Sequence, residues 1–348
     1  MKKKTRKIGL IILVFFLLIL VAGGFTAYHF YKYIYAPNVV EGAAPHFLKI
    51  PSGSGFDDVV EILSNEGLII DTNSFIWVAE KKAYPERVKP GCYQLNPGMN
   101  NNELVNLLRS GKQSPVKLTF NNLRSLEQLA GKAGEVFEED SAYIAQYLAN
   151  KLVADSLGFN GSTFIAMFIP NTYEFYWNTP ASKFVERMHE EYNKFWTSNR
   201  RQKAEKAGLS LVEVSTLASI VEMETQKNDE KSRIAGVYMN RLQSGMLLQA
   251  DPTVIYAVGD FSIRRVLLKH TEYDSPYNTY KYKGLPPGPI CMPSVSSIDA
   301  VLDYEIHDYF YFCAKEDFSG YHNFAKTLAQ HNANARKFHR PLNERNIY

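Results

Sequence analysis

Two glutamates near the middle of the chain have surroundings that suit proton-transfer chemistry. Glu222 and Glu224 lie at the end of a segment of small and apolar residues, 217–225, that reads Leu-Ala-Ser-Ile-Val-Glu-Met-Glu-Thr. A carboxyl group beside an apolar surface is harder to ionise, so its pKa rises. A carboxylic acid that stays protonated near neutral pH can serve as a general acid. Taken alone, the segment also fits an ordinary helix with two acidic surface residues.

Helical geometry distinguishes the two glutamates. Ser210 and Glu213 form a capping-box pattern, which predicts that a helix begins there. The apolar residues of this helix then share one stripe, which consists of Val214, Leu217, Ala218, Ile220 and Val221. Glu224 falls inside the stripe and Glu222 falls at its edge. An edge position offers both a dry neighbour and access to substrate, so we predict Glu222 as the catalytic acid and Glu224 as a more buried, supporting carboxylate.

Several ordered motifs follow these glutamates. A second helix is predicted from about residue 229 to Gly245, and it contains Ile-Ala-Gly-Val-Tyr-Met-Asn-Arg-Leu at 234–242. The next segment, 245–256, reads Gly-Met-Leu-Leu-Gln-Ala-Asp-Pro-Thr-Val-Ile-Tyr, in which Asp251 is either a helix cap or a site residue. The later motifs are Ser-Pro-Tyr-Asn-Thr-Tyr at 275–280, Gly-Leu-Pro-Pro-Gly-Pro-Ile at 284–290, Tyr-His-Asn-Phe at 321–324 and Thr-Leu-Ala-Gln-His-Asn at 327–332.

Together these motifs resemble the YceG-like family of endolytic murein transglycosylases. The resemblance covers about residues 46–340 and is densest over 210–335. It implies that the first glutamate of Ile-Val-Glu-x-Glu-Thr, which is Glu222 here, is the catalytic acid. The chain departs from the family pattern at Asn171, where the family usually has Asp, and at Asn323, where a second histidine often follows the one matched by His322.

The resemblance also implies a reaction. A lytic transglycosylase cleaves the bond between N-acetylmuramic acid and N-acetylglucosamine without consuming water. One carboxyl group protonates the leaving oxygen and then removes the proton of the muramic C6 hydroxyl, which attacks C1 and leaves a 1,6-anhydro end. Most glycoside hydrolases need two carboxylates, whereas this reaction needs one. The family further implies action on nascent glycan strands near peptidoglycan synthases, where cleavage terminates strand elongation.

Several polar and aromatic side chains are candidates for holding the glycan. They are Glu224, Gln249, Asp251, Tyr256, Tyr277, Asn278, Tyr280 and His322. Tyrosine rings offer flat faces to sugar rings, although each also fits an ordinary core position. Gln249 and Asn278 can hydrogen-bond acetamido groups. No cysteine or carboxylate stands at metal-ligand spacing around His322 and His331, so we expect no metal and no cofactor.

Two other function classes stay open at this point. A membrane-anchored, non-catalytic scaffold that binds peptidoglycan would need no acid at all. A conventional muramidase, which is a hydrolase, would need a second essential carboxylate, and Asp251 or Glu224 are the candidates.

The N-terminus has the pattern of a membrane anchor. Residues 1–7 carry five basic side chains, and residues 8–30 are apolar and free of Asp, Glu, Lys and Arg, which is enough for one transmembrane helix. The alternative is a cleaved signal peptide, with Ala22 and the two glycines after it as the cleavage site. The positive-inside rule predicts a single-pass protein of the plasma (inner) membrane with a cytoplasmic tail and a catalytic domain outside.

Length and local patterns predict an α+β protein of two domains behind this anchor. Residues 31–45 are predicted as a linker, 46–120 as a small LysM-like α+β module, and 121–348 as a larger mixed α/β catalytic domain. Within the module, strands are expected at 47–50, 91–95 and 116–120, and helices at 56–67, 73–82 and 102–109. A LysM-like module implies contact with glycan.

Charge and cysteine content exclude other classes. The chain has 39 basic and 36 acidic residues, and without the five basic residues of the N-terminal tail the balance is near neutral. No basic stripe indicates nucleic-acid binding. The three cysteines, Cys92, Cys291 and Cys313, cannot all pair, so this is no disulfide framework, and a single disulfide stays open.

Overall fold

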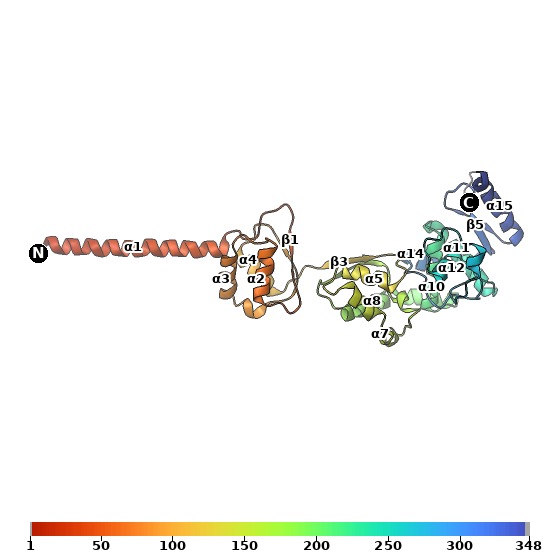
Figure 1. Ribbon diagram of the computed structural model, residues 1–348, viewed down its shortest axis with the longest axis horizontal. Helices are drawn as coiled ribbons and strands as arrows, with labels where there is room; N and C mark the ends of the chain where they lie inside the picture. Colours follow the sequence, from red (N-terminus) through yellow and green to blue (C-terminus); the bar gives the residue numbers. More distant parts are fainter. Residues whose placement is uncertain (1, 345–348) are drawn as a thin grey trace. The chain divides into compact units, whose positions relative to one another are not determined.

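The computed structural model describes residues 2–344 and contains two compact units (Figure 1). The first unit comprises Met1–Val116 with Glu174–Thr179, and the second comprises Lys117–Tyr173 with Pro180–Tyr348. Met1 and residues 345–348, the outer ends of the predicted tail and of the predicted catalytic domain, lie outside the described residues. Both units contain helices and short strands, which confirms the mixed α+β class.

The chain begins with one long apolar helix, α1 (Lys2–Tyr35). Within its segment Lys7–Tyr35, an 18-residue window has a mean hydropathy of 3.0, and the segment is long enough to cross a membrane, although a signal sequence would have the same properties. The helix continues through 31–35, where the sequence predicted a linker. Near its end, the ring of Phe30 stacks on Trp77 at 4.9 Å between centroids, which gives this last stretch a packing partner.

The rest of the first unit is a small α+β module. Its elements are β1 (His46–Ile50), α2 (Phe56–Asn65), α3 (Thr72–Lys81), the short 3-10 helix η1 (Pro85–Arg87), β2 (Gly91–Leu95) and α4 (Asn101–Ser110), which agree with the predicted ranges to within a few residues. Strands β1 and β2 pair antiparallel, with His46 opposite Leu95. The helices bury Leu63, Phe75 and Leu104 completely in one core.

Local signals define where these elements begin and end. The Asn100 side chain accepts a hydrogen bond from the Glu103 amide at 3.0 Å, and the Glu103 carboxylate accepts one from the Asn100 amide at 3.1 Å. Gly111, with φ +72°, ends the same helix. Val39 is fully buried, and its amide donates to the Met99 carbonyl at 2.9 Å. The chain just after α1 therefore belongs to this core.

The first half of the second unit is mostly helical. Its elements are β3 (Val116–Phe120), α5 (Leu126–Gly134), α6 (Ser141–Leu148), α7 (Lys151–Ser156), the 3-10 helix η2 (Phe164–Met167), β4 (Asn171–Phe175), α8 (Ala181–Phe195) and α9 (Ser198–Ala207). Strands β3 and β4 form a two-stranded sheet, and the hydroxyls of Thr119 and Thr172 lie 2.8 Å apart on it. Aromatic side chains fill the space between elements; the rings of Phe168 and Phe184 stack at 6.1 Å.

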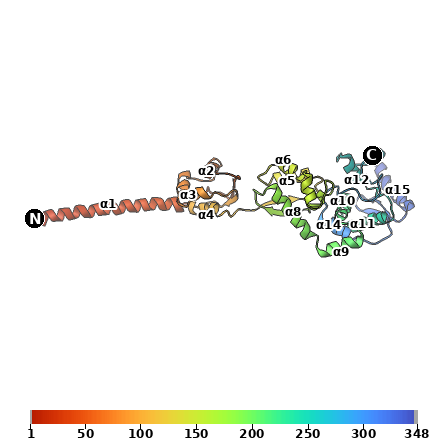
Figure 2. The ribbon, with the colours of Figure 1, turned by 90° about the horizontal axis from the view of Figure 1, so that it is seen from below.

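The second half of this unit is built around α10. Its elements are α10 (Leu211–Glu224), α11 (Asn228–Gln243), α12 (Asp251–Val258), α13 (Leu268–Thr271), α14 (Val295–Leu302), β5 (Tyr311–Ala314), β6 (His322–Ala325) and α15 (Leu328–Glu344). The predicted capping box starts α10, because the Glu213 amide donates to the Ser210 hydroxyl at 3.2 Å. All nine residues from Val214 to Glu222 are buried, and α11, α12 and α14 pack around α10 (Figures 1 and 2).

The Gly-Leu-Pro-Pro-Gly-Pro segment, residues 284–289, lies close to the first half of the unit and leads into a contact with α10. A β-carbon at Gly288 would lie 2.0 Å from the Ser162 carbonyl oxygen, so only glycine fits this close approach. Two residues later, the Ile290 amide donates to the Ser219 hydroxyl on α10 at 3.0 Å. This segment therefore ties α10 to the first half of the unit.

Candidate active site

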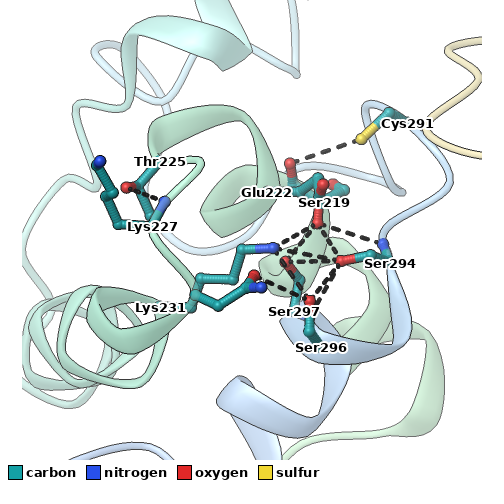
Figure 3. Close-up of polar contacts among 10 residues, drawn as sticks. Ser219, Glu222, Thr225, Lys227, Lys231, Cys291, Ser294, Ser296 and Ser297 are labelled. Atoms are coloured by element: carbon teal, nitrogen blue, oxygen red, sulfur yellow. Dashed lines mark hydrogen bonds and ion pairs between the residues drawn. The ribbon is translucent and has the colours of Figure 1, made fainter. Parts of the chain in front are cut away.

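The last turn of α10 carries both glutamates, and Glu222 lies in a buried polar cluster (Figure 3). Its Oε2 accepts hydrogen bonds from the Ser294 hydroxyl, from the Ser297 hydroxyl at 2.5 Å and from the Lys231 ammonium at 3.1 Å. Ser294 caps α14, Ser297 lies in the first turn of α14, and Lys231 comes from α11. The cluster therefore joins three helices through one carboxylate oxygen.

The surroundings of Glu222 keep it ionised. Burial disfavours the charged form, but hydrogen bonds from Ser294 and Ser297 and the positive charge of Lys231 outweigh burial and lower the pKa of Glu222. The side chains of Glu222 and Lys231 are only 9% and 5% exposed. An ionised, buried carboxylate that is already paired has no proton to donate to a substrate.

The helical-wheel prediction about exposure was wrong. It placed Glu222 at an accessible edge, whereas Glu222 is buried. Glu224 is partly exposed as a residue, although its carboxyl group is buried enough for its pKa to rise. The physical reason is that α10 is covered on more than its apolar stripe, because α14 packs against it and brings serine hydroxyls to Glu222. The catalytic role predicted for Glu222 stays a prediction, and the lowered pKa favours Glu224 for that role.

Glu224 lies in the wall of a cavity of about 340 Å³. The cavity is lined by residues from α10, α11, the 246–250 loop, α12, β5, β6 and α15, together with Tyr280. Those used below are Glu224, Tyr238, Arg241, Gln249, Asp251, Tyr280, Phe312, His322 and His331. A volume of this size lies at the lower end of the range found for small-molecule sites.

Glu224 has the properties of a general acid. Its Oε1 accepts a hydrogen bond from the Tyr238 hydroxyl at 2.6 Å. Burial raises the pKa of Glu224 to about 7; the negative charge of Asp251 adds to this, while Tyr238 and Arg241 act against it. A carboxyl group with this pKa is protonated in about half of the molecules at neutral pH, and it faces a cavity.

A strained loop and a tyrosine–aspartate pair form another part of the cavity wall. Gln249 adopts φ +49°, a left-handed conformation that is unusual for a residue with a side chain. Thr279 holds the loop in place, because the Gln249 amide donates to its carbonyl at 3.1 Å and the Ala250 amide donates to its hydroxyl at 3.0 Å. The Tyr280 hydroxyl donates to Asp251 at 2.6 Å.

Arg241 on α11 holds two backbone segments next to the cavity. Its guanidinium donates to the Leu248 carbonyl at 2.6 Å and to the Phe310 carbonyl at 2.7 Å. The residue is 7% exposed, and in the described part of the chain no carboxylate lies within ion-pair distance of it. The positive charge of Arg241 therefore acts on the cavity. Burial is the main cause of the lowered pKa of His331, and the charge of Arg241 lowers this pKa further.

Two histidines complete the wall. His322 donates its backbone amide to Glu230 at 3.1 Å, and its Nδ1 lies 2.9 Å from the other oxygen of the same carboxylate. The ring of His331 stacks on Tyr311 at 5.5 Å, and its buried Nδ1 has no hydrogen-bond partner among residues 2–344. Only His322 is oriented by a carboxylate.

Comparison with known proteins shows the family. A sequence profile of the YceG-like family matches residues 48–337. The chain belongs to the YceG-like family.

Similar proteins agree with this membership. The chain is 30% identical over 344 residues to a Bacillus subtilis protein named endolytic murein transglycosylase, covering 94% of this chain and 93% of that one. It is 29% identical over 332 residues to a Streptococcus pneumoniae protein of the same name, covering 86% of this chain and 59% of the longer streptococcal one. A crystal structure of a YceG-like protein from Listeria monocytogenes superposes with a TM-score of 0.57 at 29% identity, covering 84% of this chain and 99% of that one.

Not every residue suggested by the sequence lies in the cavity of this YceG-like chain. The rings of Tyr256 and Tyr277 pack on each other at 4.8 Å, and Tyr256 lines a separate apolar pocket with Met223 and Phe261. Asn278 is fully buried, and its amide donates to the carbonyls of Thr271 and Tyr273 at 2.9 and 2.7 Å. It holds its own loop together and has no exposed amide for the predicted contact with an acetamido group.

Sequence reasoning missed Tyr238 and Arg241 as cavity residues. Both belong to the Val-Tyr-Met-Asn-Arg-Leu motif of α11, which was predicted only as part of a helix. The signal that would have found them is the i, i+3 spacing of two polar, bulky side chains on an otherwise apolar face.

The arrangement of possible metal ligands and of the cysteines can be stated for the described residues. Among residues 2–344, no group of three or more His, Cys, Asp or Glu side chains is arranged to hold a metal ion. All three cysteines are free thiols. Cys291 lies against the Ser219 carbonyl, and burial followed by the charge of Glu222 raises its pKa to about 12, so it is an unreactive core residue.

Proposed function

We propose that this chain is an endolytic peptidoglycan lytic transglycosylase in which Glu224 is the general acid. The observation that supports this assignment most directly is the Glu224 carboxyl group itself, which lines a cavity with its pKa raised to about 7. The relatives named endolytic murein transglycosylase support the reaction, a lyase reaction on peptidoglycan.

The proposed chemistry follows from this arrangement. Glu224, held by the Tyr238 hydroxyl, donates its proton to the oxygen that links N-acetylmuramic acid to N-acetylglucosamine. The bond from that oxygen to C1 breaks, and positive charge develops at C1. The muramic C6 hydroxyl then attacks C1 and loses its proton, which gives a 1,6-anhydro end. In the simplest scheme, the Glu224 carboxylate accepts that proton and is ready for another cycle.

Other cavity residues are placed to hold the glycan. Gln249 presents an amide from a strained loop, and Tyr280 presents a ring that is tethered to Asp251. Amide and ring contacts suit acetamido groups and sugar faces respectively. We propose these residues, with His322, as the substrate-binding set.

The test is digestion of purified peptidoglycan by the full chain in detergent, read by mass spectrometry. Muropeptides one water lighter than hydrolysis products are expected. Glu224→Gln should reduce release by about 100-fold to 10,000-fold, the usual range for a lost general acid, with the fold intact. Glu222→Gln is the matched control two residues away, and it should keep activity in the fraction that folds. Near-normal activity of Glu224→Gln would refute the assignment.

One observation keeps a hydrolase as the second candidate. Asp251 shares the cavity with Glu224, so a second carboxylate is available to activate water. In that case the products would carry reducing ends, and Asp251→Asn would abolish release as completely as Glu224→Gln does.

We also propose a location and partners. Helix α1 would anchor the chain once in the plasma membrane, with the basic N-terminus in the cytoplasm and the residues after α1 outside. The module that follows α1 would act as a LysM-like glycan-binding domain, and peptidoglycan synthases would be neighbours on nascent strands. Protease protection of intact spheroplasts tests the topology, because cleavage from outside should leave a fragment of the size of α1.

A further inference from the structure

His322 and Glu230 form a dyad that has so far been given no part in proton transfer. Both oxygens of the Glu230 carboxylate accept from the same residue, one from the His322 backbone amide at 3.1 Å and one from Nδ1 at 2.9 Å. A carboxylate only accepts hydrogen bonds, so Nδ1 carries a proton, and in the neutral ring the lone pair therefore lies on Nε2. This is the arrangement in which a carboxylate orients a histidine base.

The dyad is oriented toward the same cavity as Glu224. The Glu230 side chain is 5% exposed, while that of His322 is 12% exposed and lines the cavity. The ring of Phe312 meets the His322 ring edge-on at 5.4 Å and limits its rotation. No hydrogen bond to Nε2 occurs in the part of the chain that the structure describes, so the lone pair is available to a ligand.

We propose that His322, oriented by Glu230, is the base that accepts the proton of the muramic C6 hydroxyl. This step rests on the proposed function. Glu224 gives its proton to the leaving oxygen as the C1–oxygen bond breaks, the C6 oxygen forms a new bond to C1, and the C6 proton moves to Nε2. The imidazolium is stabilised by Glu230 and returns its proton through solvent to the Glu224 carboxylate, so no atom of water is consumed.

A division between acid and base suits the geometry of the cavity. The Oε1 of Glu224 already accepts the hydrogen bond of the Tyr238 hydroxyl at 2.6 Å, so this oxygen is occupied. The dyad supplies a separate acceptor. His331, the other histidine of the cavity, has no orienting carboxylate and stacks on Tyr311 instead.

The product ratio tests this proposal, because a base for the C6 hydroxyl decides whether C6 or water captures C1. Wild-type chain, His322→Gln and Glu230→Gln are compared on purified peptidoglycan, and the fraction of 1,6-anhydro ends is measured against reducing ends. His322→Gln should lower kcat by about 10-fold to 100-fold and raise the share of reducing ends. Glu230→Gln should shift both in the same direction, by less. His189→Gln, a histidine on α8 outside the cavity, is the matched control and should change neither.

The outcomes separate the two proposals. If Glu224→Gln is inactive and the wild type makes anhydro ends, but His322→Gln keeps the wild-type rate and ratio, only the dyad proposal is wrong. A raised KM with unchanged kcat and ratio would show that His322 binds substrate, and it would also overturn the proposal. If the wild type makes only reducing ends, the proposed function fails first. Thermal unfolding monitors folding; if His322→Gln does not fold, Glu230→Gln decides, and an unchanged ratio there refutes the dyad.

Discussion

Glu222 and Glu224 lie two residues apart on α10 and have opposite electrostatic environments. Glu222 is paired with the buried Lys231 ammonium, at 3.1 Å, and has a lowered pKa. Glu224 accepts from the Tyr238 hydroxyl at 2.6 Å in a cavity wall, and burial raises its pKa to about 7. Two carboxyl groups with pKa values moved apart by their surroundings are typical of a site in which one is structural and the other transfers a proton.

The pH dependence of the reaction follows from Glu224. The acid must be protonated before the bond breaks, so kcat/KM should fall as the pH rises above about 7, approaching a tenfold loss per pH unit on this alkaline side. Rates on purified peptidoglycan, measured at intervals of about one pH unit from roughly pH 5 to pH 9, would check this. A rate that stays constant up to the alkaline end would contradict Glu224 as the acid.

Glu224 should also make the stability of the fold depend on pH. The folded chain binds the Glu224 proton more tightly than the unfolded chain does, so its contribution to stability is lost as pH rises from about 4.3 through 7. Glu224→Gln carries no such charge and should raise the free energy of unfolding at pH 8 by about 1–3 kcal/mol, with little effect near pH 4. Urea unfolding at both pH values measures it; equal effects at both would argue against a raised pKa.

Glu222 and Lys231 form a buried ion pair, so mutations of these two residues should have non-additive effects on stability. Lys231→Met leaves an ionised Glu222 without its ammonium and should cost about 3–5 kcal/mol of stability. The double variant Glu222→Gln with Lys231→Met removes both charges and should cost less than the sum of the single variants. Strict additivity in this cycle would show that the two side chains do not interact.

The Tyr238 hydroxyl should affect the pH profile of kcat/KM, because it donates a hydrogen bond to Glu224. Its hydrogen bond lowers the pKa of Glu224, so Tyr238→Phe should move the alkaline fall of kcat/KM to higher pH, by about half to one unit. Tyr143→Phe, on the exposed side of α6, serves as the control with an unchanged profile. A profile that moves to lower pH in Tyr238→Phe would contradict the assigned direction.

Substitution of Gly288 should create a packing defect away from Glu224. Gly288→Ala would place a β-carbon 2.0 Å from the Ser162 carbonyl and should cost about 1–3 kcal/mol, the range for overpacking. Gly131→Ala, at a helical position of α5 with nothing within 4 Å, is the matched control and should stabilise by about 0.5–1 kcal/mol. Thermal unfolding of both compares them; a stabilising Gly288→Ala would show that the backbone moves apart easily.

Much of the fold was readable from local chemistry. The capping pair Ser210 and Glu213 predicted the start of α10, and the helices and strands predicted over 46–110 match those of the first unit. The strand predicted at 116–120 also forms, but it pairs with β4 in the second unit and so does not belong to the small module. Such signals act between neighbours in the chain, so the sequence carries them completely. The end of α1 was misjudged, because its last turns are supported by Trp77, which lies far along the sequence.

The cavity was only partly readable. Gln249, Asp251, Tyr280 and His322 were proposed for one site, and the structure does bring them together with Glu224. Arg241 and Tyr238 went unnoticed, since their i, i+3 spacing becomes meaningful only when β5, β6 and α15, which follow much later in the chain, complete the cavity beside α11. Conversely, a conspicuous residue such as Asn278 stabilises its own loop.

By itself, the sequence determined the family resemblance, the apolar N-terminal helix and the pair of glutamates at the end of a capped helix. Only the tertiary structure decided how these two carboxyl groups differ. The reason is that a pKa depends on burial, charge and hydrogen bonds from distant segments. The hydroxyl of Ser297, 75 residues after Glu222, keeps that carboxylate ionised, while the wall built from α11, β5 and β6 leaves Glu224 facing a cavity.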